Sequence, residues 1–168
     1  MLLARLTGGL SASAVARLDA PASHSPSFQA DKSQGADKRI LFDQVMPARL
    51  AVGNDGSIWF TRSWSVDRGD SLIGRLHPDG EVTYITIPTA NGGPADLTTG
   101  PLGDIWFTEY KANKIGVILE SGEVKEYSVP TPDSGPLGIT AISSGVAFVE
   151  HKANKIGIVW LLAPHVSP

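Results

Sequence analysis

The side chains that could move a proton or bind a metal ion are thinly spread along this chain. The 168 residues include 17 acidic residues and four histidines but no cysteine, which excludes disulfides, thiolate metal sites and a cysteine nucleophile. We expect the histidines to be surface or tail residues: His24, His77, His151 and His165. Nothing resembles a phosphate-binding glycine loop, a serine nucleophile elbow or a zinc-binding helix. Any catalytic chemistry must come from groups that folding brings together.

Charge and hydropathy restrict the partners of the chain. The 14 Lys and Arg against 17 Asp and Glu give a net charge of −3, which argues against binding to nucleic acid. The longest apolar stretch, Ile156 to Ala163, is far shorter than the about 18 residues that a membrane span requires. We therefore expect neither a nucleic acid nor a membrane as a partner.

Residues 1–38 differ from the rest in composition. They are rich in Ala, Ser and Gly and lack a periodic apolar pattern, which predicts a flexible leader. The start at Met1 and the later Ala14-Val15-Ala16 suggest a signal peptide, but polar residues and glycines interrupt the apolar core that secretion requires. The sequence favours a cytoplasmic protein. Secretion or periplasmic export is the alternative if residues 1–20 act as a signal.

An internal repeat organises the chain after this leader. Independent markers recur at one spacing: 42 residues separate Gly74 from Gly116, Pro88 from Pro130 and Pro94 from Pro136. A third copy follows, with Gly157 standing 41 residues after Gly116. Because several markers share one period, chance is not a serious explanation.

Each repeat is predicted to contain four short strands. In the second repeat they cover about residues 96–99, 104–109, 114–119 and 123–129, with Gly, Pro and Asn in the turns between them. Ile105-Trp106-Phe107 is apolar at consecutive positions, so this strand is expected to be buried on both faces. A four-stranded unit of about 42 residues is typical of a β-propeller blade, and a solenoid is the structural alternative.

The fold prediction is therefore an all-β chain of antiparallel propeller blades. About three blades are expected, over about residues 39–89, 90–131 and 132–160, followed by an irregular tail at 161–168. The third is expected to lack its outer strand, because the sequence after Val159 does not resemble the outer strand of the second. Closed propellers have four to eight blades, so we predict an incomplete ring and expect self-association to complete it.

Two residues are binding candidates once the blades are placed. Asp96 lies on the predicted inner strand, where its carboxylate could face the central channel and help to hold a cation. The alternative is a solvated acid that lines the channel. Trp64 lies in the first repeat between Arg62 and Leu72, where that repeat has five additional residues. Loops of this kind often carry binding residues, so Trp64 is a predicted partner contact.

Several motifs resemble the blade consensus of the streptogramin lyases, the virginiamycin B lyase-like propellers. They are Ile-Trp-Phe-Thr-Glu at 105–109, Asn-Lys-Ile-Gly at 113–116 and 154–157, Glu-Tyr-Ser-Val-Pro-Thr at 126–131 and Gly-Pro-Leu-Gly-Ile-Thr at 135–140. The resemblance covers about residues 40–159 and implies a seven-bladed propeller with a magnesium ion. It also implies a small cyclic peptide as substrate, a type B streptogramin whose lactone opens by β-elimination.

The resemblance also assigns site residues. It places catalytic histidines directly after the proline that opens an inner strand, and the matching positions here hold Ala48, Ala95 and Leu137, which cannot move a proton. A catalytic glutamate at the end of the Trp-Phe strand matches Glu109 and Glu150, so both are catalytic candidates. Their alternative role is structural, as hydrogen-bond acceptors near a turn. The residues of the metal site cannot be assigned.

Three functions stay open from the sequence. The first is a lyase that opens lactone antibiotics with the help of a metal. The second is a non-catalytic, ligand- or protein-binding propeller fragment, which the missing histidines favour. The third is a truncated product with no function of its own.

Overall fold

The computed structural model describes residues 28–30, 40–42, 46–62 and 71–161. The chain divides into two units, residues 1–44 and 45–168. In the first unit, β1 (Phe28–Ala30) pairs antiparallel with β2 (Ile40–Phe42). Thus β1 lies within the segment predicted to be a leader, and β2 pairs with β1 although it lies in the range predicted for the first blade. The flexibility of the leader stays a prediction, because most of residues 1–38 lie outside the described part.

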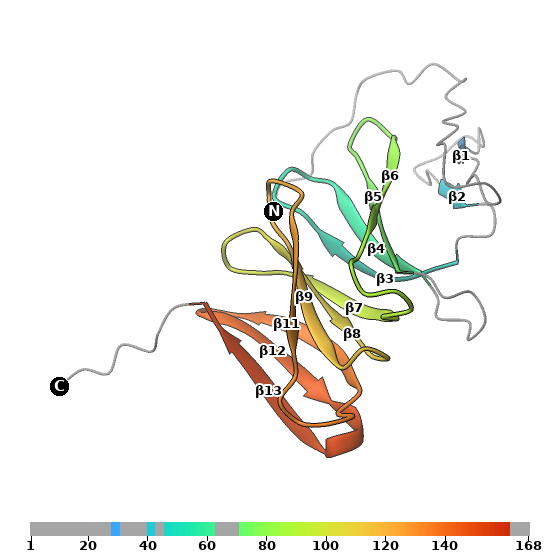
Figure 1. Ribbon diagram of the computed structural model, residues 1–168. Coiled ribbons are helices and arrows are strands. Elements are labelled where there is room, and N and C mark those ends of the chain that lie inside the picture. The colour runs from blue at the N-terminus through green and yellow to red at the C-terminus, as the bar shows by residue number, and fades with distance from the viewer. Residues whose placement is uncertain (1–27, 31–39, 43–45, 63–70, 162–168) are drawn as a thin grey trace. The chain divides into compact units, whose positions relative to one another are not determined.

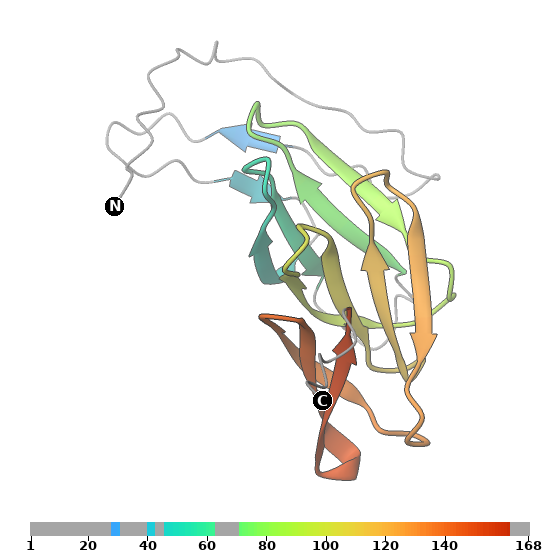
Figure 2. The same ribbon diagram turned by 90° about the vertical axis from the view of Figure 1, so that its left-hand side faces the viewer.

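The described residues of the second unit form three antiparallel sheets that follow one another along the chain (Figures 1 and 2). The first has the order β3 (Pro47–Val52), β4 (Ile58–Arg62), β5 (Leu72–Leu76) and β6 (Val82–Thr86). The second has the order β7 (Pro94–Thr99), β8 (Ile105–Glu109), β9 (Lys114–Ile118) and β10 (Val124–Ser128). The third contains β11 (Pro136–Ile142), β12 (Gly145–Glu150) and β13 (Lys155–Trp160), with a short 3₁₀ turn η1 (His151–Ala153) before β13. We call these sheets blades 1, 2 and 3.

The strands predicted for the second repeat are confirmed to within two residues at each end. Blade 3 has three strands among the described residues, and β13 is the last of them. The expected lack of an outer strand stays a prediction, because residues 162–168 lie outside the described part. The part of the chain that the structure describes contains no helix with the length and hydrophobicity of a membrane span.

The turn before the third strand repeats in blades 2 and 3, as the identical hexapeptides at 111–116 and 152–157 predict. Asn113 and Asn154 both adopt the left-handed backbone conformation, with φ of 56° and 53°. Asparagine tolerates this region better than most residues, which explains its place in both turns. The Asn113 side chain also donates hydrogen bonds to the carbonyls of Val129 and Thr131 and accepts one from the Ser134 amide. Its role is structural.

Each blade has two faces, which we define by the side chains that its second strand places on them. The leading face carries the phenylalanine of that strand, and the trailing face carries the residue before it. Trp59 and Ile73 on the trailing face of blade 1 pack in one core cluster with the leading face of blade 2, including Leu97, Phe107 and Ile118. A second cluster joins the trailing face of blade 2 to the leading face of blade 3 through Trp106, Ile115, Val117, Ile139 and Phe148.

Strand β8 lies between these two clusters. All five of its residues are buried, which confirms the prediction that this strand is covered on both faces. The core of the second unit is therefore two layers of apolar side chains between three sheets. The inner strands β3, β7 and β11 lie next to one another along the inside of the array.

Candidate functional site

The candidate site is the end of the blades at which the inner strands begin and the second strands finish. The opening proline of each inner strand pairs with the last residue of the second strand: Pro47 with Arg62, Pro94 with Glu109 and Pro136 with Glu150. In all three blades the register shifts directly after this proline. A β-bulge of this kind redirects side chains, and bulges are frequent beside active sites.

The bulges hold the positions where the resemblance implies histidines. Ala48 is exposed, Ala95 is buried and Leu137 is half-buried. None of these side chains can accept a proton. All three blades thus have the bulge at which the resemblance implies a catalytic histidine, but each bulge carries an apolar residue at that position.

Asp96 lies in the bulge of β7 and connects two blades. One oxygen, Oδ1, accepts a hydrogen bond from the Leu97 amide at 2.9 Å, and Oδ2 accepts one from the Ile139 amide of β11 at 3.2 Å. Thr108 strengthens the same joint, because its hydroxyl donates to the Leu137 carbonyl at 2.7 Å. The Asp96 carboxylate therefore holds neighbouring inner strands together, and its binding of a cation stays a prediction.

We expect Asp96→Ala to lower the free energy of unfolding by about 1 to 3 kcal/mol, the usual cost of leaving a backbone donor without its partner. The Ile139 amide loses its acceptor in this variant, and residue Ile139 is buried. Urea unfolding followed by tryptophan fluorescence measures the difference. Glu123→Ala, which removes an exposed carboxylate paired with Lys125, is the matched control. Equal losses in the two variants would contradict a bridging role for Asp96.

Glu109 ends β8 and is fully buried between blades 1 and 2. Neither of its carboxyl oxygens has a hydrogen-bond partner among the described residues, so the acceptor role expected for it is not seen. The side chain lies so close to Gly92 that a Cβ at that position would overlap Oε2. Burial, and then the negative charge of Glu126, raises the pKa of Glu109 to about 7, although Lys114 opposes the shift.

A network of polar side chains that the sequence did not predict lies next to Glu109. The Lys114 ammonium donates to Glu126 Oε2 at 2.8 Å, and the Thr89 amide and hydroxyl donate to the same carboxylate at 2.8 and 2.6 Å. Although burial opposes it, these bonds hold the pKa of Glu126 below its ordinary value. The sequence contained one indication of this network: Glu126 is an acidic residue at the position of the outer strand where blade 1 has Tyr84. The network ties the segment after blade 1 to the outer strand of blade 2.

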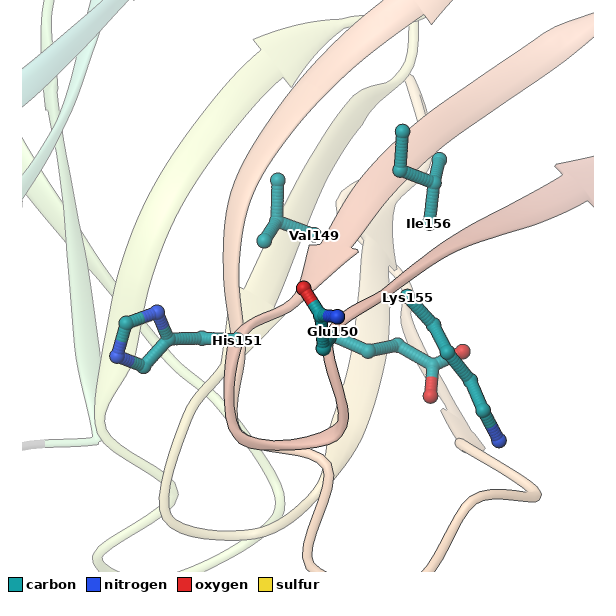
Figure 3. A pocket seen from close by; sticks show the side chains of 6 residues that line it. Val149, Glu150, His151, Lys155 and Ile156 are labelled. Atoms are coloured by element: carbon teal, nitrogen blue, oxygen red, sulfur yellow. The ribbon is translucent and has the colours of Figure 1, made fainter.

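Glu150 is the counterpart of Glu109 in blade 3. It is buried, and its Oε2 has no hydrogen-bond partner among the described residues. It lines a surface pocket of about 390 Å³, together with Val149, His151, Asn154, Lys155 and Ile156. Figure 3 shows that the His151 ring and the Glu150 carboxylate point to opposite sides. They do not form an acid–base pair in this arrangement.

The candidate acids do not converge on one point. Glu109 lies between blades 1 and 2, and Glu150 belongs to the leading face of blade 3, which packs on blade 2. In the described ranges no group of three or more His, Cys, Asp or Glu side chains could hold a metal ion. These carboxylates therefore do not offer magnesium a ligand set. Trp64, the predicted partner contact, lies outside the described residues.

Comparison with known proteins gives a consistent result. A model of the virginiamycin B lyase family matches residues 34–161. A virginiamycin B lyase of Nocardia farcinica (strain IFM 10152) is 35% identical over 71 residues, which is 42% of this chain and 23% of that protein.

Two solved structures of virginiamycin B lyase from Staphylococcus aureus are similar to the chain. The selenomethionine-substituted enzyme has a TM-score of 0.65 and 33% identity, over 79% of this chain and 44% of that one. A catalytically inactive histidine-to-alanine variant with quinupristin has a TM-score of 0.62 and 30% identity, over 77% and 48%. The chain thus spans between about a quarter and a half of the length of these relatives.

Proposed function

Since this chain belongs to the virginiamycin B lyase family, we propose that its blades act in a propeller that opens the lactone of a type B streptogramin by β-elimination. The substrate is a cyclic peptide antibiotic closed by an ester bond. The observation that carries the proposal is the repeated joint at the candidate site. In each of the three described blades, a proline-opened, bulged inner strand pairs with the end of a second strand.

The proposed reaction needs a base but no water molecule. The base removes the proton from the carbon α to the ester carbonyl of the threonine residue, and the electron pair forms a double bond to the β-carbon. The bond between the β-carbon and the ester oxygen breaks, and the released group leaves as a carboxylate. The linear product therefore has the same mass as the cyclic substrate, whereas hydrolysis would add one water.

The described residues support this reaction as a scaffold. Glu109 is fully buried, and Ala48, Ala95 and Leu137 carry no titratable group, so none of them presents a base to an open channel. Asp96 uses both of its oxygens to hold backbone amides. We infer that these residues shape the site, and that the base is either Glu150, which lines the surface pocket, or a residue of the chain outside the described ranges.

The test is incubation of the full chain with quinupristin and magnesium, followed by liquid chromatography and mass spectrometry. We expect a new species with the mass of the substrate and the absorbance of a dehydroamino acid, and we expect chelation of magnesium to prevent it. Magnesium is added because the family resemblance implies it. A product heavier by one water would overturn elimination, and the absence of turnover at every concentration would overturn the lyase proposal.

The catalytic candidates Glu109 and Glu150 are tested in the same assay. Loss of a general acid or base typically lowers the rate by about 10²- to 10⁴-fold. A loss of that size in Glu109→Gln or Glu150→Gln, with unchanged folding, would assign that residue a catalytic role. If a variant has the kcat of the wild type, the glutamate that it replaces has only a structural role between the blades.

A second candidate function is binding without turnover. The apolar residues at all three bulges, Ala48, Ala95 and Leu137, favour it. Equilibrium dialysis distinguishes the two functions, because a binding propeller retains quinupristin that is recovered unchanged. A lyase instead returns the ring-opened isomer.

A further inference from the structure

Asn91 and Gly92 form the only Asn–Gly pair of the sequence, and they lie in the segment that joins blade 1 to blade 2. Asn91 is exposed and adopts the left-handed backbone conformation, with a φ of 58°. An asparagine before a glycine is prone to deamidation, because glycine has no side chain to hinder the attack of its own amide nitrogen on the asparagine side chain. The reaction replaces a neutral amide by a carboxylate.

The segment between blades 2 and 3 shows what a carboxylate does at this position. Asp133 stands 42 residues after Asn91 and has a φ of 45°. It forms an ion pair with Lys152 at 2.6 Å. Lys152 belongs to the turn before the third strand, where the identical hexapeptide of blade 2 has Lys111. In blade 3 this pair therefore ties the segment before the inner strand to a turn of the same blade.

Blade 2 has the same arrangement without the carboxylate. The Lys111 amide donates to the Gly92 carbonyl at 3.1 Å, and in blade 3 the Lys152 amide donates to the equivalent carbonyl, that of Ser134, at 2.9 Å. Each lysine side chain crosses the glycine before the opening proline, and its Cγ lies 3.1 Å from the place of a Cβ on that glycine in both blades. Among the described residues, Lys111 forms no ion pair. The side chain of residue 91 makes the difference.

We propose that Asn91 is a modification site, at which spontaneous deamidation gives an aspartate that pairs with Lys111. The Gly92 nitrogen bonds to the side-chain carbonyl carbon of Asn91, its proton passes to the leaving ammonia, and a cyclic succinimide remains. Water then adds across one of the two ring carbon–nitrogen bonds. Breaking the bond to the side-chain carbonyl gives aspartate, and breaking the bond to the main-chain carbonyl gives isoaspartate.

The surroundings of Gly92 favour aspartate. Isoaspartate adds one carbon to the main chain directly before Gly92, which is buried. A Cβ on Gly92 would already overlap Oε2 of Glu109, a fully buried side chain, so the segment has no space into which to shift. Aspartate keeps the length of the main chain and gives blade 2 the ion pair of blade 3. This inference concerns a chemical modification and does not depend on the proposed lyase activity.

The first test is incubation of the full chain at mildly alkaline pH, followed by peptide mapping with mass spectrometry that distinguishes aspartate from isoaspartate. We expect residue 91 to acquire the mass of aspartate, with aspartate as the main product. Asn113 and Asn154 are internal controls, because they share the left-handed conformation but are followed by lysine. Conversion of Asn91 no faster than that of these controls would overturn the modification site. Isoaspartate as the main product in the folded chain would overturn the pairing.

The second test measures the ion pair in Asn91→Asp, which contains the product from the start. Limiting acetic anhydride acetylates free lysines, and we expect the reactivity of Lys111 to fall several-fold in this variant. Asp133→Asn makes the reciprocal change, and it should raise the reactivity of Lys152 by a similar factor. Lys125, which pairs with a carboxylate of its own, should react equally in both variants and the wild type. Unchanged reactivity of Lys111 in Asn91→Asp, with folding confirmed by circular dichroism, would overturn the proposed pair.

Discussion

Replacement of Gly116 by alanine is expected to lower the free energy of unfolding by about 3 kcal/mol, the upper end of the usual cost of overpacking a core. The ring of Phe107 lies directly over Gly116, and a Cβ there would overlap three ring carbons. Phe107 is fully buried in the cluster between blades 1 and 2, so it has no space into which to move. Urea unfolding of the two chains at one pH measures the loss.

Two further variants show whether the overlap is the cause. Gly138→Ala is the matched control, because the nearest atom to a Cβ at that position lies 3.8 Å away, an ordinary contact. We expect it to change the stability little. The second variant combines Gly116→Ala with Phe107→Leu, which removes the ring. The double variant should lose less stability than the two single losses added together, and strict additivity would contradict the steric explanation.

Replacement of Glu109 by glutamine is expected to stabilise the protein by about 3 kcal/mol at pH 8 and by much less below pH 5. Burial, together with the charge of Glu126, raises the pKa of Glu109 to about 7 from an ordinary value of 4.5. The folded chain therefore binds this proton more tightly than the unfolded chain does. The stability that the proton contributes is present below about pH 4.5 and is lost as the pH rises through 7. Glutamine resembles the protonated acid and has no proton to lose.

The measurement is the free energy of unfolding of both chains between pH 4.5 and 8. The difference between them should grow across this range. Glu123→Gln, which removes an exposed carboxylate in a turn of the same blade, controls for the change in net charge. A constant difference between Glu109→Gln and the wild type across the range would contradict a buried acid that titrates near neutral pH.

The sequence could predict the blades because their signals are local. The period of 42 residues, the turn residues between strands and the consecutive apolar residues at 105–107 each lie within a few positions of the feature that they specify. Side chains alternate between the two faces of a strand, so Trp106 and Phe107 side by side already require a layer on both sides. Family membership follows from the same motifs.

The site could be predicted only in part, because its contacts join different repeats. The sequence placed Glu109 and Glu150 at the ends of equivalent strands, where the structure has them. It did not show that Glu109 is buried with no hydrogen-bond partner among the described residues, since the Gly92 backbone and the Glu126 charge that surround it come from other segments. The bridging role of Asp96 depends in the same way on an amide 43 residues along the chain.

The glycines of the repeat show most clearly which features are local to the sequence and which depend on the tertiary structure. The sequence by itself determined that Gly74, Gly116 and Gly157 mark one position in three successive blades. Only the tertiary structure decided why that position excludes a side chain: the phenylalanine ring of the neighbouring strand lies over each glycine and takes the space of a Cβ. It also decided which blade faces are covered, so that equivalent isoleucines are 0%, 1% and 74% exposed. The local pattern is the same in all three blades, and burial depends on which blade packs against each of them.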